Sequence, residues 1–131
     1  MGCGNSQTNF RDCTTVFETF NLLEKSLQQI KSYKEESDVN SNDYKLYNQY
    51  TNKIESTINF VKDKPLAYID DRLNIFRDII NRYYHSCISS NTEEFEKSQS
   101  ELEDFILKMM DYYKGIRDST VYRNNTLESE F

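Results

Sequence analysis

The sequence predicts an all-α protein, an up-down-up-down antiparallel four-helix bundle between an N-terminal peptide and a loose C-terminal tail. Only 3 Gly and 1 Pro occur among 131 residues, so long helices would meet few residues that interrupt them. Apolar residues recur in four stripes with steps of three and four, which is the spacing of one helix face. Short polar segments separate the stripes, and short connections favour antiparallel neighbours.

The first helix is expected over residues 15–36. Thr15 and Glu18 form a capping-box sequence at its start, in which each side chain accepts a backbone N–H of the other residue. The polar stretch over residues 37–43 is interpreted as a connection. The apolar stripe of this helix is Val16, Phe20, Leu23, Leu27 and Ile30.

The second helix is expected over residues 43–62, with Ser41 or Asn42 as its cap. Pro65 then marks a break, because proline is tolerated at a first helical position but not in a helix interior. The stripe of the second helix begins after Tyr44 and consists of Tyr47, Tyr50, Ile54, Ile58 and Val61.

The third helix is expected over residues 65–88, and its stripe has the regular alternation of a heptad seam. Its members are Leu66, Ile69, Leu73, Phe76, Ile80, Tyr83 and Cys87.

The fourth helix is expected over residues 92–116 and opens with acidic residues, which favour a helix N-terminus. The predicted four-helix domain covers residues 14–118, and residues 119–131 form the tail. The fourth stripe is Phe95, Leu102, Phe105 or Ile106, Met109, Tyr112 or Tyr113, and Ile116. Two helical hairpins that pair between chains would show the same four stripes, so that arrangement stays open.

The first six residues carry the most specific signal in the chain. Met1-Gly2 followed by Ser6 fits the N-myristoylation pattern, in which the Gly amine takes a C14 chain after Met1 is removed. Cys3 lies beside that Gly and can take a palmitoyl chain as a thioester. A start added by cloning would explain Met1 and Gly2, but neither Cys3 nor Ser6. We therefore expect residues 1–13 to be a flexible, lipidated anchor peptide, with lipidation at Gly2 and Cys3.

This start resembles the N-termini of Src-type kinases and of inhibitory-class G-protein α subunits, which also begin Met-Gly-Cys with Ser at the sixth position. The resemblance covers residues 1–6 alone. It implies myristate on Gly2 and palmitate on Cys3, and it implies no kinase or GTPase activity. Gln7 departs from it, because many such signals carry Lys at that position.

Physical chemistry favours two acyl chains over one. A single myristoyl chain gives only marginal membrane binding, with an association constant near ~10⁴ M⁻¹. A polybasic patch is a common second signal, but Arg11 is the only cation among the first 24 residues, and the net charge is −6. Palmitate on Cys3 is therefore expected to supply the second signal, and Cys13 is a candidate for additional acylation. No apolar run approaches the ~20 residues of a spanning helix.

The sequence carries no pattern for catalysis, a metal or a cofactor. Di-iron bundles need Glu-x-x-His on two helices, whereas the single His85 has no acid at that spacing. His85 is interpreted as a surface or boundary residue, and Cys87 as a buried, inert thiol. Cys3, Cys13 and Cys87 lack CxxC spacing, which disfavours a disulfide framework or a zinc site. We expect no enzyme activity, no cofactor and no metal.

The stripe of Tyr44, Tyr47 and Tyr50 has two interpretations. Tyrosine is favoured at interaction surfaces, but stripes at helical spacing are more often core. We expect these residues in the core or at its edge, with contact to a partner protein as the alternative. Nucleic acid is not an expected partner, because no basic patch stands out.

These observations predict a non-enzymatic, membrane-tethered helical adaptor or scaffold on the cytoplasmic leaflet of the plasma, endosomal or ciliary membrane. Its expected partners are the membrane, through the lipid anchors, and one or more proteins of unknown identity. Three alternatives stay open: a helical subunit of a larger assembly without lipid, a small ligand-binding or catalytic bundle, and a secreted effector acylated in a host. A homo-oligomer also stays open.

Overall fold

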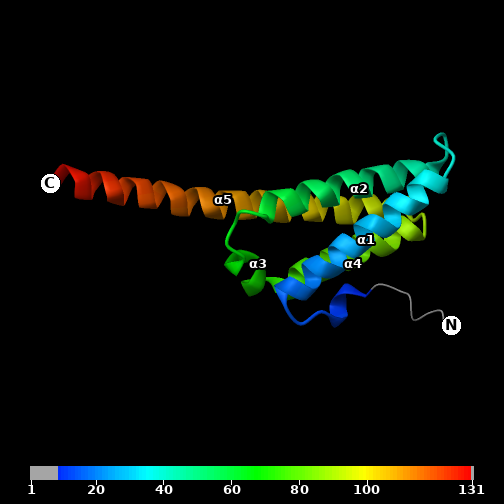
Figure 1. The fold of residues 1–131 in the computed structure, drawn as a ribbon, viewed down its shortest axis with the longest axis horizontal. Helices are drawn as coiled ribbons and strands as arrows, with labels where there is room; N and C mark the ends of the chain where they lie inside the picture. The colour runs from blue at the N-terminus through cyan, green and yellow to red at the C-terminus, as the bar shows by residue number, and fades with distance from the viewer. Residues whose placement is uncertain (1–8, 131) are drawn as a thin grey trace.

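The computed structural model describes residues 9–130, with side chains for residues 9–115, and no strand occurs among them. The all-α class is therefore confirmed for the described part of the chain. In chain order the elements are the 3-10 helix η2 (Phe10–Asp12) and the helices α1 (Val16–Glu36), α2 (Asn42–Val61), α3 (Ala67–Asp71), α4 (Leu73–Ile88) and α5 (Thr92–Glu130) (Figure 1).

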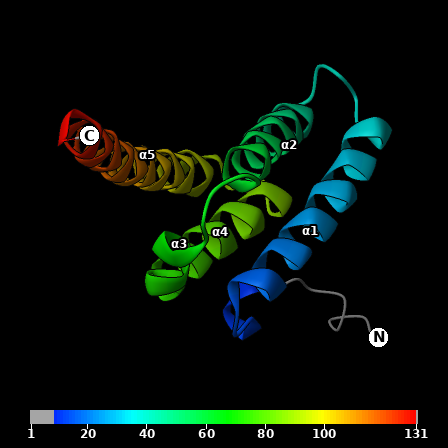
Figure 2. The same ribbon diagram turned by 60° about the vertical axis from the view of Figure 1, so that its left-hand side comes forward.

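The longer helices form two pairs that share one core. The most extensive contacts join α1 with α2 and α4 with α5, and α2 packs on α4 between the pairs. Figures 1 and 2 show α1 beside α2 and α4, while α5 extends well beyond the other helices at its C-terminal end. Tyr50 of α2 contacts Tyr83 and Tyr84 of α4, with ring centroids 5.0 and 6.1 Å apart. The two hairpins therefore meet within one chain.

The start of α1 is fixed by its own local hydrogen bonds. Thr15 Oγ1 accepts the Glu18 N–H at 3.0 Å, which is the capping interaction that the sequence indicates. The Glu18 carboxylate in turn accepts the Thr14 N–H at 3.0 Å and the Thr14 hydroxyl at 2.6 Å. These bonds satisfy N–H groups that would otherwise lack partners at a helix end. No residue before Thr14 takes part in these capping bonds.

The single helix expected over residues 65–88 is divided into α3 and α4 at Arg72. Arg72 has φ −122° and ψ 26°, and its guanidinium donates to the Tyr68 carbonyl at 3.1 Å. The break lets Tyr68 turn toward α5, where its ring lies 5.5 Å from Phe105. Leu66, expected in the third stripe, is 41% exposed because it precedes this turn. Tertiary packing of Tyr68 thus overrides the heptad pattern.

The C-terminal segment differs from the loose tail expected over residues 119–131. The backbone of α5 stays helical through Glu130. Residues 116–131 contain neither Gly nor Pro, and extending an existing helix requires far less ordering than starting one. The expectation of a loose tail is therefore wrong as far as Glu130.

Candidate functional site

The predicted lipidation sites Gly2 and Cys3 lie outside the described residues. The described chain begins at Asn9, six residues after Cys3. Residues 9–13, which we call the strap, connect the anchor signal to the helical body and pack against α4. The strap and its seat are therefore the described structure nearest to the acylation signal.

Phe10 fixes the strap to α4. Its side chain is 0% exposed, and its ring meets the edge of Tyr84 with centroids 6.0 Å apart. Its backbone N–H donates to Asn81 Oδ1 at 3.1 Å. Burial of one Phe side chain contributes about 1.5–3 kcal/mol. Phe10 is thus a core residue, although the sequence places it in the anchor peptide.

Two arginines flank this apolar contact. Arg11 Nη2 lies 2.8 Å from Asp78 Oδ1 on α4, and both side chains remain about half exposed. The Arg77 guanidinium donates to the backbone carbonyl of Cys13. The strap is therefore held at its middle by Phe10 and Arg11 and at its end by Arg77.

The ion pair of the strap continues into a network that joins α4 to α5. Arg82 Nε donates to Asp78 at 2.9 Å, and its two Nη atoms bind Glu101 at 2.6 and 2.8 Å. Glu94 accepts a longer bond from Arg82 at 3.3 Å. The hydrogen bonds from Arg82 lower the pKa of Glu101. Burial opposes ionisation of Asp78, but the bonds from Arg82 and Arg11 outweigh it and lower its pKa.

Cys13, the candidate for additional acylation, is the last residue of the strap and is buried when the strap is docked. The residue is 6% exposed, and desolvation raises the pKa of its thiol. A thiol that is covered and protonated is a poor nucleophile. The expected boundary at residue 13 is therefore wrong, because Phe10 and Cys13 are part of the folded body rather than of a flexible peptide.

The three tyrosines of the second stripe lie in two different settings. Tyr50 is 0% exposed, its hydroxyl is 2.7 Å from Ser26 Oγ, and burial raises its pKa. Tyr44 and Tyr47 are half-buried at the core edge. Lys34 lies 5.8 Å from the Tyr44 ring, and Tyr33 lies 5.9 Å from the Tyr47 ring. Tyr50 therefore cannot face a partner, whereas Tyr44 and Tyr47 retain accessible edges.

The remaining residues singled out in the sequence show no reactive arrangement. Cys87 is 0% exposed, and desolvation raises the pKa of its thiol to about 12. His85 lies at the surface boundary, with its ring 5.2 Å from Tyr84. Within the residues that the structure describes, no group of three or more His, Cys, Asp or Glu side chains could hold a metal ion.

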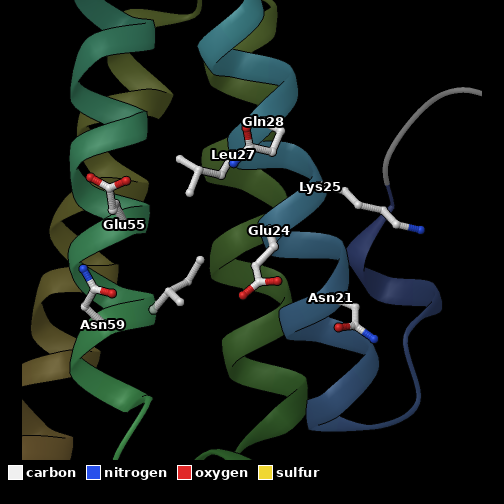
Figure 3. A pocket seen from close by; sticks show the side chains of 8 residues that line it. Asn21, Glu24, Lys25, Leu27, Gln28, Glu55 and Asn59 are labelled. Atoms are coloured by element: carbon white, nitrogen blue, oxygen red, sulfur yellow. The ribbon is translucent and has the colours of Figure 1, made fainter.

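A groove of about 480 Å³ opens between α1 and α2. Figure 3 shows Glu24 and Gln28 of α1 on one side, Glu55 and Asn59 of α2 on the other, and α4 crossing behind. Leu27 and Ile58 supply its apolar part. Small-molecule sites are usually lined by apolar groups with a few polar ones. Here polar and charged residue types outnumber the two apolar ones, and the groove indicates no particular ligand.

Sequence reasoning missed the residues that hold the strap. Phe10 belongs to no periodic segment, and its seat residues Arg77, Asp78 and Asn81 lie outside the predicted apolar stripe of the third helix. The one available signal was an aromatic side chain in an otherwise polar N-terminal stretch. Such a side chain needs an apolar surface, and the sequence does not say which one.

Comparisons of the chain with protein-family models, with curated proteins and with solved structures found no match. None of the helices among the described residues has the length and apolar character needed to cross a bilayer. Functional inference therefore rests on the residues of this chain.

Proposed function

We propose that this protein is a non-enzymatic helical adaptor tethered to the cytoplasmic leaflet of the plasma, endosomal or ciliary membrane. Myristate on Gly2 and palmitate on Cys3 provide the tether, and the helical body binds a protein partner. The observation that carries the proposal is the sequence Met1-Gly2-Cys3 with Ser6, which places two acyl acceptors side by side. Two chains give stable anchoring where one gives only marginal binding.

The short link between the anchor and the strap supports a body held close to the bilayer. Fully extended chain spans at most about 3.3–3.6 Å per residue, so Cys3 lies within about 21 Å of Asn9. Lipid on Gly2 and Cys3 therefore keeps the strap face of the bundle near the membrane. The surfaces of α2 and α5 are then free to contact a protein.

We further propose that the four long helices alternate in direction, as in an up-down-up-down bundle. Between α1 and α2, the contacts Ser26–Tyr50 and Tyr33–Tyr47 pair rising residue numbers in α1 with falling numbers in α2, as antiparallel helices do. The contacts Phe76–Phe105 and Tyr83–Phe95 do the same for α4 and α5. In this order each long helix keeps one outer face available for recognition.

The test is the distribution of the protein between membrane and soluble fractions of its own cell. The native chain is expected with membranes, carrying one C14 amide and one C16 thioester by intact mass. Gly2→Ala, which removes the myristate acceptor, is expected in the soluble fraction. Cys3→Ser is expected to bind weakly and reversibly, because one myristoyl chain remains.

Gly4→Ala is the matched control, because position 4 of the myristoylation pattern accepts any residue. It is expected to fractionate as the native chain does. A native protein whose Gly2 amine is unmodified, or a Gly2→Ala form that stays with membranes, would contradict the proposal.

One observation favours a second candidate, a helical subunit of a larger assembly. Tyr113 of α5 donates to the Pro65 carbonyl, and the α5 backbone continues well past it to Glu130. Leu107 and Met110 on α5 are 59% and 45% exposed. Stable recovery of the native protein in a complex, with an unmodified Gly2 amine, would support this candidate instead.

A further inference from the structure

The strap can leave α4 without disturbing the helix that follows it. The capping bonds of α1 involve Thr14, Thr15 and Glu18, none of which belongs to the strap. Residues 10–12 contact α4 as their main partner element. Because the cap is local, α1 keeps its first turn whether residues 9–13 are docked or not.

The seat of the strap also remains satisfied when the strap is absent. Asp78 keeps its bond to Arg82 at 2.9 Å after losing Arg11. Tyr84 keeps its hydroxyl bond to Gln29 and its ring contact with Tyr50. Asn81, which accepts from the Phe10 N–H, can bond to water instead. Arg77 loses the Cys13 carbonyl but keeps its bond to Asn74 Oδ1. Release of the strap therefore leaves the charged groups of its seat with partners.

The attachments of the strap are few for the number of residues that they order. One buried ring, one backbone hydrogen bond and one half-exposed ion pair hold the middle of the segment. Exposed ion pairs contribute little, and each ordered residue loses backbone entropy. Segments with few apolar contacts open at lower free energy than the core of the same protein.

We propose that residues 9–13 form a releasable strap, which opens independently of the helical core and sets the length of the chain between the lipid anchor and the bundle. Docked, the strap fixes the chain at Phe10. Released, it leaves the chain fixed only from Thr14, where the capping bonds of α1 begin.

The two states differ in the reach of the tether. From Cys3 to Phe10 the chain spans at most about 25 Å, and from Cys3 to Thr14 about 40 Å. This consequence rests on the proposed acylation of Gly2 and Cys3, whereas release of the strap does not. The docked state then holds the bundle close to the bilayer, and the released state lets it reach a more distant partner.

The experiment uses the native cysteines as reporters in the full-length Cys3→Ser chain without lipid. Cys13 becomes reactive when the strap opens, whereas Cys87 lies in the core and becomes reactive only when the bundle unfolds. A thiol-alkylating reagent is added under native conditions, and the rate at each cysteine is read from peptide masses. Cys13 is expected to react at least about tenfold faster than Cys87, because local opening has a lower free energy than global unfolding.

Phe10→Ala is expected to accelerate Cys13 at least about tenfold, toward the rate of a free thiol, while Cys87 remains at least about tenfold slower than Cys13. Phe17→Ala is the matched control, since Phe17 is 72% exposed and should change neither rate. Equal rates at Cys13 and Cys87 in the Cys3→Ser chain would overturn the proposal, as would a Cys13 rate that Phe10→Ala leaves unchanged. An unmodified Gly2 in the native protein would instead contradict the proposed anchoring and leave these rates as they are.

Discussion

At the scale of single residues, the hydroxyl pair between α1 and α2 shows how polar groups are accommodated in this core. Ser26 Oγ donates to the Leu23 carbonyl at 2.7 Å, so its lone pairs remain free to accept from the Tyr50 hydroxyl, also at 2.7 Å. Both residues are almost completely buried. The Tyr50 hydroxyl therefore depends on Ser26, whereas the Ser26 hydroxyl proton does not depend on Tyr50.

This asymmetry predicts unequal costs for the two substitutions. Ser26→Ala leaves a buried phenol without its partner and is expected to lower the free energy of unfolding by about 2 kcal/mol. Tyr50→Phe removes the unsatisfied group together with the bond and is expected to cost about 1 kcal/mol. Urea unfolding followed by circular dichroism measures both. A larger loss for Tyr50→Phe would show that the donor assignment is reversed.

The Arg82 network predicts a pH dependence of stability. The pKa values of Asp78 and Glu101 are lowered in the folded protein, so both carboxyls bind protons more readily after unfolding. The stability that they contribute is therefore present above their unfolded pKa, about 4, and is lost as the pH falls through the folded values. Unfolding free energy should decline below about pH 5, and Arg82→Gln should make this decline shallower.

The size of this effect is limited by solvent screening. Arg82→Gln is expected to cost about 1 kcal/mol at pH 7, because Asp78 and Glu101 are each more than one-third exposed. Lys108→Gln is the control, since its ion pair with Asp104 is mostly exposed and should contribute nothing measurable. An Arg82→Gln protein with the native pH profile would show that the network is not coupled to folding.

At the scale of elements, Gly115 is the weakest position of α5. It lies inside the helix, it is exposed, and a Cβ built there would meet nothing within 4 Å. Gly115→Ala is therefore expected to stabilise the helix by about 0.5–1 kcal/mol, because alanine loses less backbone entropy. Helical circular dichroism and the thermal midpoint should both rise. A fall in either would mean that the helix bends at Gly115 in solution.

The helices themselves follow closely from sequence features. Thr15 and Ser41 cap α1 and α2 through side-chain bonds at 3.0 and 3.1 Å, and each residue type is favoured at that position. The division at Arg72 has no comparable local signal. It arises because the Tyr68 ring packs on Phe105, a contact between residues far apart in the sequence. A periodic pattern locates a helix face but does not show where neighbouring packing interrupts the helix.

The candidate site was less predictable than the helices. Helical periodicity correctly places Tyr50 on a buried face, but it cannot show that a peptide outside the four predicted helices covers α4. Phe10 belongs to that peptide, and its burial depends on tertiary contacts with Asn81 and Tyr84 rather than on its own neighbours. The acylation signal at Gly2 and Cys3 remains a prediction from sequence.

At the scale of the whole molecule, the C-terminal part of α5 adds length to the protein without adding to the stability of the bundle. The helix has 39 residues, about 58 Å at 1.5 Å per residue, and its C-terminal part extends past the other helices (Figure 1). Deleting residues 119–131 is therefore expected to change the free energy of unfolding of the purified chain by less than about 0.5 kcal/mol. A larger loss would show that this segment packs on the body or on a second copy.

The overall charge opposes the proposed anchor at an anionic membrane. The chain has a net charge of −6, and its anchor peptide has no basic cluster, so the body adds repulsion where a polybasic segment would add attraction. Binding of the doubly acylated protein to vesicles should weaken as phosphatidylserine replaces phosphatidylcholine. Raising the salt from about 0.1 M toward 1 M should reverse that loss, because the Debye length falls from about 10 to 3 Å.

Vesicle sedimentation measures this prediction, and a single myristoylated Cys3→Ser form serves as the sensitive comparison because its binding is marginal. Both forms carry the same body charge, so both should show the same sign of lipid and salt dependence. Stronger binding to the anionic vesicles would require a basic surface to face the bilayer. Arg11 is paired with Asp78, and Arg82 with Asp78 and Glu101, so these strap-side cations are already neutralised and stronger binding to anionic vesicles would contradict the prediction.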